Sequence, residues 1–316
     1  MNTSFSNSCS RALVLAGAGA AGNAWQIGLV AGLAEAGVDL TEADLVIGTS
    51  AGSTAAAMIT SGTLPAELYA AVFAQTAPSR PSAAPSGHLP GVHTPSTHAP
   101  VAPGRTGMSV DTYMTWTDEL VAASTDAGDW RRRISTAVLE LDLSDNVSSQ
   151  RWRETVAARL PSQSWPEQRV LIAAVDARTA EPVVFDRDSG IPLADAVAAS
   201  TSNGAAGAYR LGDARYINGA YRRSSNADLA AGYDRVLVLD PFGGRSRTPI
   251  EWGMDLATQV VELRASGSAV EVVFPDAGAG DVFNANAADP STRPQAARGG
   301  YEQGQSLASQ LAEFWD

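Results

Sequence analysis

Two short apolar runs near the start of the chain, each followed by a glycine turn and an alanine-rich stretch, constrain the fold most strongly. Residues 11–16 (RALVLA) precede the turn 17–22 (GAGAAG), and residues 43–48 (ADLVIG) precede the turn 49–52 (TSAG). Short apolar runs bounded by turn residues are typical of buried strands in a parallel sheet. The sequence therefore predicts two consecutive units of strand, turn and helix.

The same alternation of buried strands and helices continues through the rest of the chain. Further strands are expected at residues 169–177, 181–187, 235–241 and 269–275, the first two as a pair joined by a polar turn. Helices are expected over residues 23–36, 51–60, 65–75, 110–124, 129–143, 147–160, 191–199, 249–265 and 294–315, and residues 199–221 are expected to be rich in loops. The pattern predicts an α/β fold with a central, mainly parallel sheet and helices on both faces.

The organisation of the chain favours a flexible N-terminus over residues 1–10 and one domain over residues 11–316, because it has neither an internal repeat nor a strong boundary. Residues 76–108 differ from the rest in their many prolines, serines and threonines. Such a composition cannot form a helix core or a central strand, so we expect a surface loop. The loop follows the turn at residue 50 closely enough to act as a lid, and an inert insertion is the alternative.

Charge and composition exclude several classes of function. A formal net charge of −12 argues against a nucleic-acid binder and against stable electrostatic docking on an anionic membrane, and no stable membrane insertion is expected. All 22 basic residues are arginine, so chemistry that requires a lysine is excluded. The single cysteine, Cys9, excludes an internal disulfide and a multi-cysteine metal site, and we expect a cytoplasmic protein. Residues 11–25 imitate a secretory signal, but they are better explained as a strand and a glycine turn.

The glycine turn 17–22 has the G-x-G-x-x-G spacing of a dinucleotide-binding loop. A nicotinamide site also needs an acidic residue at the end of the second strand, where it holds the ribose hydroxyls. That strand ends in Gly48-Thr49-Ser50, and Asp39 and Asp44 lie before it or at its start. The dinucleotide interpretation is therefore weak, and no cofactor is expected.

Ser50 stands in a G-x-S-x-G pentapeptide between a predicted strand and a predicted helix. Small residues such as Gly48 and Gly52 allow the backbone to bend sharply there, so that the serine hydroxyl is exposed at an elbow. The following helix then directs its N-terminal N–H groups at the reacting atom. The earlier glycine turn supplies further N–H groups for an oxyanion. These candidate oxyanion donors are Gly17, Ala18, Gly19 and Ala20.

The chain lacks a base for Ser50 at the place where an α/β-hydrolase has one, which is a histidine that follows the serine and an acid along the chain. The chain has three histidines, His88, His93 and His98, and all of them lie in the proline-rich segment. Because no histidine follows residue 98, the order serine, acid, histidine is impossible. We interpret the three histidines as part of a solvated loop, and no metal site is expected.

The remaining option is a serine and aspartate pair, and at this point the chain resembles the patatin-like phospholipase family over residues 11–60 and 165–310. That family has a glycine-rich oxyanion loop, a G-x-S-x-G elbow and, much later, an aspartate in a D-G-[GA] turn. The corresponding stretches here are GAGAAG, GTSAG and Asn218-Gly219-Ala220. The resemblance implies a three-layer α/β sandwich and acyl-ester chemistry through an acyl-Ser50 intermediate, without metal or cofactor.

Two departures from the family pattern bear on activity. Ala21 stands where the family's oxyanion loop usually has a lysine or arginine, and Asn218 stands where the family has the aspartate. A carboxamide keeps the shape of a carboxylate but has no comparable basicity. Four interpretations remain open: an inactivated variant, a homologue that uses another base, a pseudoenzyme, and deamidation of the Asn-Gly pair to aspartate.

Three carboxylates are candidates for a replacement base, and each has a structural alternative. Asp213 is interpreted as a hairpin turn residue, and Asp176 as a turn residue at the end of a strand. Asp228 is interpreted as a charge in the first turn of a helix that Asn226 caps.

We therefore expect a serine acyl hydrolase or acyltransferase that acts on a lipid or another acyl ester or thioester. The altered pair suggests a specialised role in secondary metabolism. A non-catalytic acyl-binding or scaffold protein with the same fold is the alternative. The expected partner is a small acyl-ester substrate, and the oligomeric state is left open.

Four tryptophans are expected to pack in the core or at its edge, or to line an acyl groove: Trp116, Trp130, Trp152 and Trp165.

Overall fold

The computed structural model describes residues 9–76, 108–141, 146–205, 207–284 and 287–315. The predicted flexible N-terminus (1–10) and the predicted loop or lid (76–108), which holds the three histidines, lie almost entirely outside these residues.

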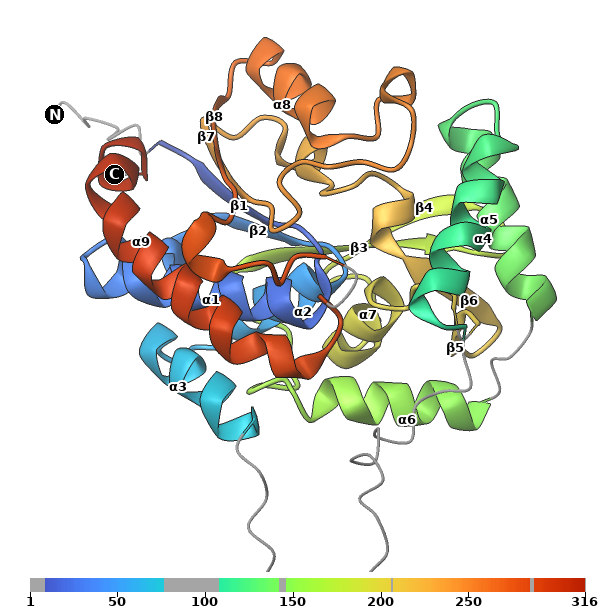
Figure 1. The fold of residues 1–316 in the computed structure, drawn as a ribbon, viewed down its shortest axis with the longest axis horizontal. Helices are drawn as coiled ribbons and strands as arrows, with labels where there is room; N and C mark the ends of the chain where they lie inside the picture. The colour runs from blue at the N-terminus through green and yellow to red at the C-terminus, as the bar shows by residue number, and fades with distance from the viewer. Residues whose placement is uncertain (1–8, 77–107, 142–145, 206, 285–286, 316) are drawn as a thin grey trace, which may run out of the picture.

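The described residues form one sheet of eight strands, in the order β5-β6-β3-β2-β1-β7-β8, with β4 paired to β3 (Figure 1). The strands are β1 Arg11–Leu15, β2 Leu45–Gly48, β3 Arg169–Asp176, β4 Glu181–Phe185, β5 Tyr209–Leu211, β6 Ala214–Asn218, β7 Arg235–Leu239 and β8 Ala269–Val273. Neighbours among β3, β2, β1, β7 and β8 are parallel, whereas β4, β5 and β6 pair antiparallel. The prediction of a mostly parallel sheet in an α/β fold is confirmed.

Helices cover both faces of this sheet, with α8 on one face and α1, α2, α3 and α9 on the other (Figure 1). The α-helices are α1 Gly19–Glu35, α2 Ala51–Ile59, α3 Pro65–Thr76, α4 Val110–Ala122, α5 Ala127–Leu141, α6 Asn146–Ala157, α7 Leu193–Ser200, α8 Leu256–Ala265 and α9 Arg293–Trp315. The 3₁₀ turns are η1 Leu40–Glu42, η2 Gly219–Tyr221, η3 Ala227–Ala230, η4 Ile250–Trp252, η5 Ala277–Ala279 and η6 Pro290–Thr292.

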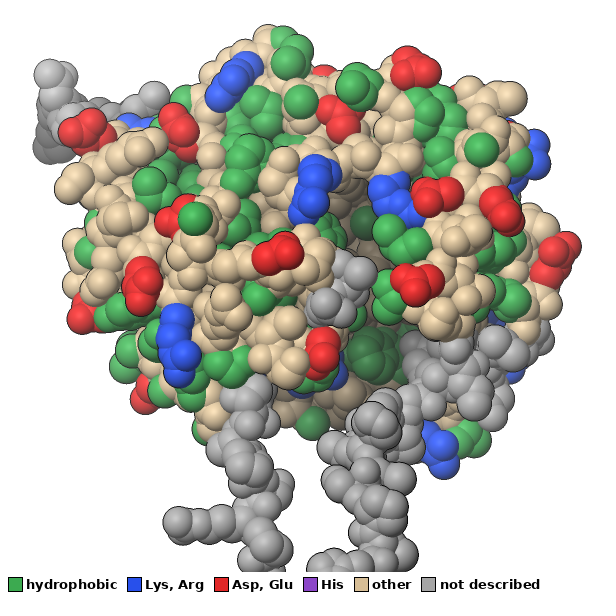
Figure 2. Space-filling model, viewed as in Figure 1, with side chains coloured by type: hydrophobic (Ala, Val, Ile, Leu, Met, Phe, Trp, Pro, Cys, Tyr) green, Lys and Arg blue, Asp and Glu red, His purple; other side chains and the backbone are tan. Residues whose placement is uncertain are grey.

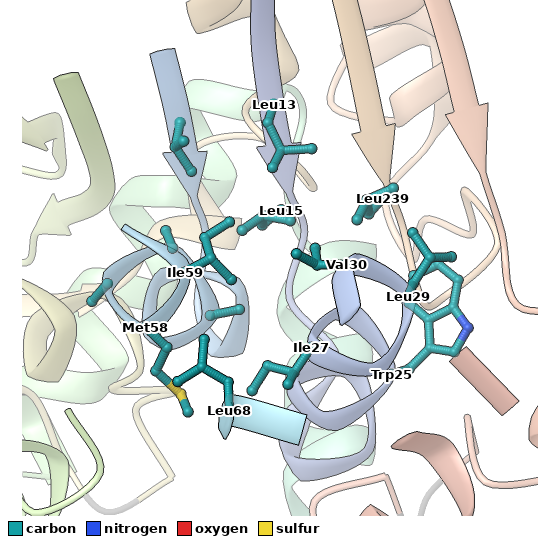
Figure 3. Packing of buried hydrophobic residues seen from close by; sticks show 14 of the residues in the cluster. Leu13, Leu15, Trp25, Ile27, Leu29, Val30, Met58, Ile59, Leu68 and Leu239 are labelled. Atoms are coloured by element: carbon teal, nitrogen blue, oxygen red, sulfur yellow. The ribbon is translucent and has the colours of Figure 1, made fainter. Parts of the chain in front are cut away.

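The three layers follow from the side-chain alternation of the central strands, because successive residues of a strand point to opposite faces. Leu13 and Leu15 of β1 pack in the cluster that contains α1 and α2, whereas Ala12 and Val14 pack in the cluster on the α8 face. Figure 3 shows the first cluster, in which side chains from α1 and α2 meet the leucines of the sheet. A strand buried on both faces explains why these segments are almost wholly apolar.

Helices α1 and α9 pack closely through glycines on both (Figure 1). A Cβ atom built on Gly28 or Gly32 of α1 would lie 2.1 Å from a backbone oxygen of α9. A Cβ on Gly300 of α9 would lie 2.2 Å from the carbonyl oxygen of Trp25. The two backbones therefore approach each other at a distance that only glycine allows.

We expect Gly300→Ala to lower the free energy of unfolding by about 1–3 kcal/mol, because the added methyl overpacks this contact. The direction of this change is informative, because alanine is a better helix former than glycine. It would therefore stabilise α9 if its methyl group had room. Urea unfolding followed by circular dichroism measures the change. Ser309→Ala, at an exposed position of the same helix, is the matched control and should shift stability by less than about 0.5 kcal/mol. A Gly300→Ala protein as stable as the parent contradicts the close packing.

Three details differ from the sequence prediction. Helix α1 begins at Gly19, inside the glycine turn rather than after it. Residues 199–221, predicted to be rich in loops, contain the β5–β6 hairpin. The helix predicted over residues 249–265 is divided into η4 and α8, because Gly253 adopts a left-handed φ of 64° and ends the first turn.

A hollow opens on the face shown in Figure 2, between α4 and the side of the molecule that carries α1 and α9, and apolar side chains line part of it. It lies near the carboxyl ends of β1 and β2, where open α/β sheets bind their ligands. Among the described helices, none is both long and apolar enough to cross a bilayer.

Candidate active site

Ser50 lies on a strained turn between β2 and α2, with φ 54° and ψ −126°. Positive φ is uncommon for a residue other than glycine and persists only where the surrounding structure enforces it. The flanking glycines make this turn sterically feasible. A Cβ on Gly48 would lie 2.5 Å from the Cα of Ser53, and a Cβ on Gly52 would lie 2.0 Å from the carbonyl oxygen of Leu15.

The glycine turn after β1 lies against the Ser50 side chain. A Cβ on Gly17 would be 2.7 Å from Ser50 Cβ and 3.3 Å from Ser50 Oγ. Ala18 precedes α1, and Gly19 and Ala20 form its first turn. Neither α1 nor α2 has a side-chain cap at its N-terminus, and the positive ends of two helix dipoles lie near one hydroxyl. The N–H groups of Ala21, Gly52 and Ser53 donate to backbone carbonyl oxygens, so only part of each helix end is available to an anion.

Asn218, the last residue of β6, forms a hydrogen bond with Ser50. Its Nδ2 donates to Ser50 Oγ at 2.9 Å, and its Oδ1 accepts from the Ala220 backbone N–H at 2.9 Å. The Ala220 N–H fixes the orientation of the carboxamide, because a flipped amide would place its NH2 group against this N–H, and both groups are donors. Asn218 is 7% exposed. Ser50 Oγ therefore faces a donor at the position where a carboxylate would be an acceptor.

A buried polar network joins the serine turn to the Asn218 turn. Asn226 Nδ2 donates both to Thr49 Oγ1 at 2.9 Å and to the carbonyl oxygen of Gly219 at 3.1 Å. Thr49 Oγ1 in turn donates to the carbonyl oxygen of Ser225 at 3.0 Å. Asn226 is fully buried and adopts the left-handed conformation, with φ 58°, that asparagine tolerates better than most residues. It therefore holds the two halves of the site together.

Asn226 stands at the N-cap position of η3, as interpreted, but it makes no side-chain cap hydrogen bond to this turn. Its partners lie up to 177 residues away along the chain, so local sequence could not identify them.

Two more serines hold the backbone of residue 50. Ser200 Oγ, at the end of α7, accepts from the Ser50 N–H at 2.9 Å, and Ser53 Oγ donates to the Ser50 carbonyl oxygen at 2.6 Å. Both side chains are fully buried. Ser200 was not found from the sequence, where it is one of many serines in a stretch of small residues.

The candidate replacement bases have other partners. Asp213 is exposed at the β5–β6 turn, five residues from Asn218 or about 16 Å along an extended chain. Asp228 forms an ion pair with Arg222 at 2.7 Å. Asp176 accepts from the backbone N–H of Arg178 at 2.8 Å in the β3–β4 turn. The turn interpretations of Asp213 and Asp176 agree with their positions. Asp228 lies in the first turn of η3, as interpreted, and its partner there is an arginine side chain.

One buried carboxyl group follows β7, beside the end of β1. Asp240 is 4% exposed, and burial raises its pKa even though its carboxylate accepts the Phe242 N–H at 2.9 Å. Its hydrogen bond closes a local turn, so we assign it a structural role. Among the described residues, no group of three or more histidine, cysteine or acidic side chains could hold a metal ion.

The family relationship rests on a comparison with models of protein families. Residues 13–231 match the model of the patatin-like phospholipases, which is more than half of the chain. The chain belongs to the patatin-like phospholipase family. A search of the curated proteins gave no match. The matched region of this patatin-like chain includes Gly17, Ser50 and Asn218, and it ends before β7, α8, β8 and α9.

Proposed function

We propose that this patatin-like protein is a serine acyl hydrolase or acyltransferase that acts on a lipid or another acyl ester or thioester. Ser50 Oγ attacks the carbonyl carbon, and the backbone N–H groups of the 17–20 turn and of the α2 N-terminus hold the resulting oxyanion. The alcohol or thiol then leaves, and water or an acceptor alcohol releases the acyl group from Ser50. The observation that carries the proposal is the strained Ser50 turn, against which Gly17 packs and to which Asn218 donates at 2.9 Å.

In this proposal Asn218 orients Ser50 but does not accept its proton. A carboxamide that donates to Oγ leaves the serine O–H free, and the proton passes to water or to a basic group of the substrate. General base catalysis contributes about 10²–10⁴ in rate, so the first acylation is slow by this factor. Slow acylation suits a specialised acyl transfer in secondary metabolism better than bulk digestion of phospholipid.

A second candidate function is non-catalytic binding of an acyl group. The direction of the Asn218 hydrogen bond favours it, because Asn218 offers Ser50 Oγ a donor and no basic acceptor for the serine proton. The same oxyanion donors would then hold the carbonyl of an acyl ligand without covalent reaction.

A fluorophosphonate probe distinguishes the two functions, because it phosphonylates a serine only where the nucleophile and the oxyanion site work together. We expect labelling of the wild-type protein at Ser50, located by peptide mass spectrometry, together with slow hydrolysis of p-nitrophenyl esters. Ser50→Ala should lose both signals. Folded wild-type protein that stays unlabelled supports acyl binding instead.

A further inference from the structure

Arg222 contacts the polar network that joins the two halves of the candidate active site. It follows Asn218 by four residues, and its backbone N–H donates to the carbonyl oxygen of Gly219 at 3.0 Å. Its side-chain Nη1 donates both to Asn226 Oδ1 at 2.8 Å and to Asp228 Oδ1 at 2.9 Å. Its Nη2 donates to Asp228 Oδ2 at 2.7 Å. One carboxylate thus binds both ends of the guanidinium fork, and one end also reaches the buried amide of Asn226.

This guanidinium sets the orientation of the Asn226 side chain. Because Asn226 Oδ1 accepts from Arg222, its Nδ2 faces the opposite way, toward Thr49 Oγ1 and the carbonyl oxygen of Gly219. A flipped amide would place its NH2 group against the Arg222 donors and its oxygen against the Gly219 carbonyl oxygen. Asn226 is fully buried, so bulk water does not relieve either contact. The arginine therefore holds the amide in the one orientation that satisfies all of its partners.

The two residues that the Asn226 amide group contacts are the chain neighbours of the reacting side chains. Thr49 directly precedes Ser50, and Gly219 directly follows Asn218. A rotation of the Asn226 amide would therefore release the serine turn from the Asn218 turn. The 2.9 Å contact between Asn218 Nδ2 and Ser50 Oγ depends on the relative position of these two turns.

Arg223, the next residue along the chain, provides a close comparison. The side chains of Arg222 and Arg223 are 17% and 18% exposed, and both form ion pairs. Arg223 Nη1 pairs with Glu262 Oε2 of α8 at 2.5 Å and lies 3.8 Å from Asp228 Oδ2. Among the hydrogen bonds of the described residues, none joins Arg223 to Asn226. The contact with the buried amide is therefore what distinguishes the two arginines.

We propose that Arg222 is a positioning residue of the active site, which acts through Asn226 on the serine turn and the Asn218 turn. The Asp228 carboxylate neutralises its charge and holds its planar fork in one orientation. The fork fixes the buried amide, and the amide fixes the two turns. The effect on reactivity rests on the proposed acyl chemistry, whereas the effect on the geometry of the two turns does not.

The rate constant for fluorophosphonate labelling of Ser50 in the full chain tests this role. We expect Arg222→Ala to lower it about tenfold or more, because a misplacement of about 1 Å at a reacting group can cost as much as 10²-fold. Arg223→Ala is the matched control and should be labelled at the parental rate, although it also loses an ion pair. Millimolar guanidinium should restore the labelling of Arg222→Ala, because it can occupy the vacated place beside Asn226 and Asp228. It should not change the labelling of Arg223→Ala.

Crystal structures of the two variants give a second measurement, which does not depend on reactivity. In Arg222→Ala we expect the Asn226 amide to change its orientation. We also expect Asn218 Nδ2 to lie beyond hydrogen-bond distance of Ser50 Oγ. The Arg223→Ala structure should keep both features of the parent. If Arg222→Ala does not fold, Arg222→Met keeps most of the side-chain volume without the donors and should show the same changes.

The contrary outcomes are distinguishable from one another. Equal loss of labelling in Arg222→Ala and Arg223→Ala would mean that both arginines only stabilise the fold, and it overturns the inference. Parental labelling of Arg222→Ala, or an unchanged Asn226 amide in its structure, overturns the inference as well. A parent protein that stays unlabelled refutes the proposed function instead, and the two structures then still decide whether Arg222 positions the turns.

Discussion

The variant Asn218→Asp is expected to hydrolyse p-nitrophenyl esters about 10²- to 10⁴-fold faster than the parent protein, which is the range of a well-placed general base. The substitution replaces the side-chain NH2 group with an oxygen atom and keeps both contacts of the side chain. Oδ1 continues to accept from the Ala220 N–H, and the second oxygen replaces the Nδ2 that lies 2.9 Å from Ser50 Oγ. The carboxylate then accepts the serine proton as Oγ attacks. Steady-state kcat/KM with one ester under identical conditions measures the gain.

Two controls make this comparison decisive. The double variant Ser50→Ala, Asn218→Asp should be inactive, which assigns the gain to the serine. The intact mass of the parent must show no one-dalton gain, because deamidation at Asn218-Gly219 would make the same change and mask the effect. We expect the parent to be unmodified, since the carboxamide is held at both ends and Gly219 packs against the Ala173 backbone. An unchanged rate in Asn218→Asp contradicts the view that the base is the missing part.

The layers of the fold could be predicted from sequence because each strand of the parallel region is a short apolar run bounded by turn residues. The β5–β6 hairpin was not predicted because β5 has only three residues, Tyr209–Leu211, and follows a stretch of glycine and alanine. The helix boundaries differ from the prediction where a single glycine sets them, as at Gly253.

The candidate site could be predicted only in part, for a different reason. The spacing around Ser50 is local, and the sequence alone therefore identified this residue. Asn218 needed the family motif, because nothing around it distinguishes it from other turn residues. Asn226 and Ser200 act through contacts with residues 150 or more positions away. No local pattern contains this information, so only the folded chain reveals them.

A methyl group at Gly17 is expected to reduce fluorophosphonate labelling of Ser50, and the kcat/KM of the Asn218→Asp protein, by about 10²-fold or more. This is the loss that follows when one oxyanion donor is displaced. In Gly17→Ala the new Cβ would lie 2.7 Å from Ser50 Cβ, so either the serine turn or the glycine turn must move. A displacement of this kind separates the N–H groups of the 17–20 turn from the position of the oxyanion. The rate constant for labelling measures the effect directly, since it needs no substrate turnover.

The Gly17→Ala result must be separated from a general loss of stability, because the same overpacking lowers the free energy of unfolding by about 1–3 kcal/mol. Gly62→Ala is the matched control: Gly62 has φ 81° and open space around its Cα, so alanine there adds backbone strain without a clash. We expect the control to lose stability but to be labelled at the rate of the parent. Labelling of Gly17→Ala at the parental rate would mean that the glycine turn does not hold the oxyanion, and the α2 N-terminus alone would then have to supply the donors.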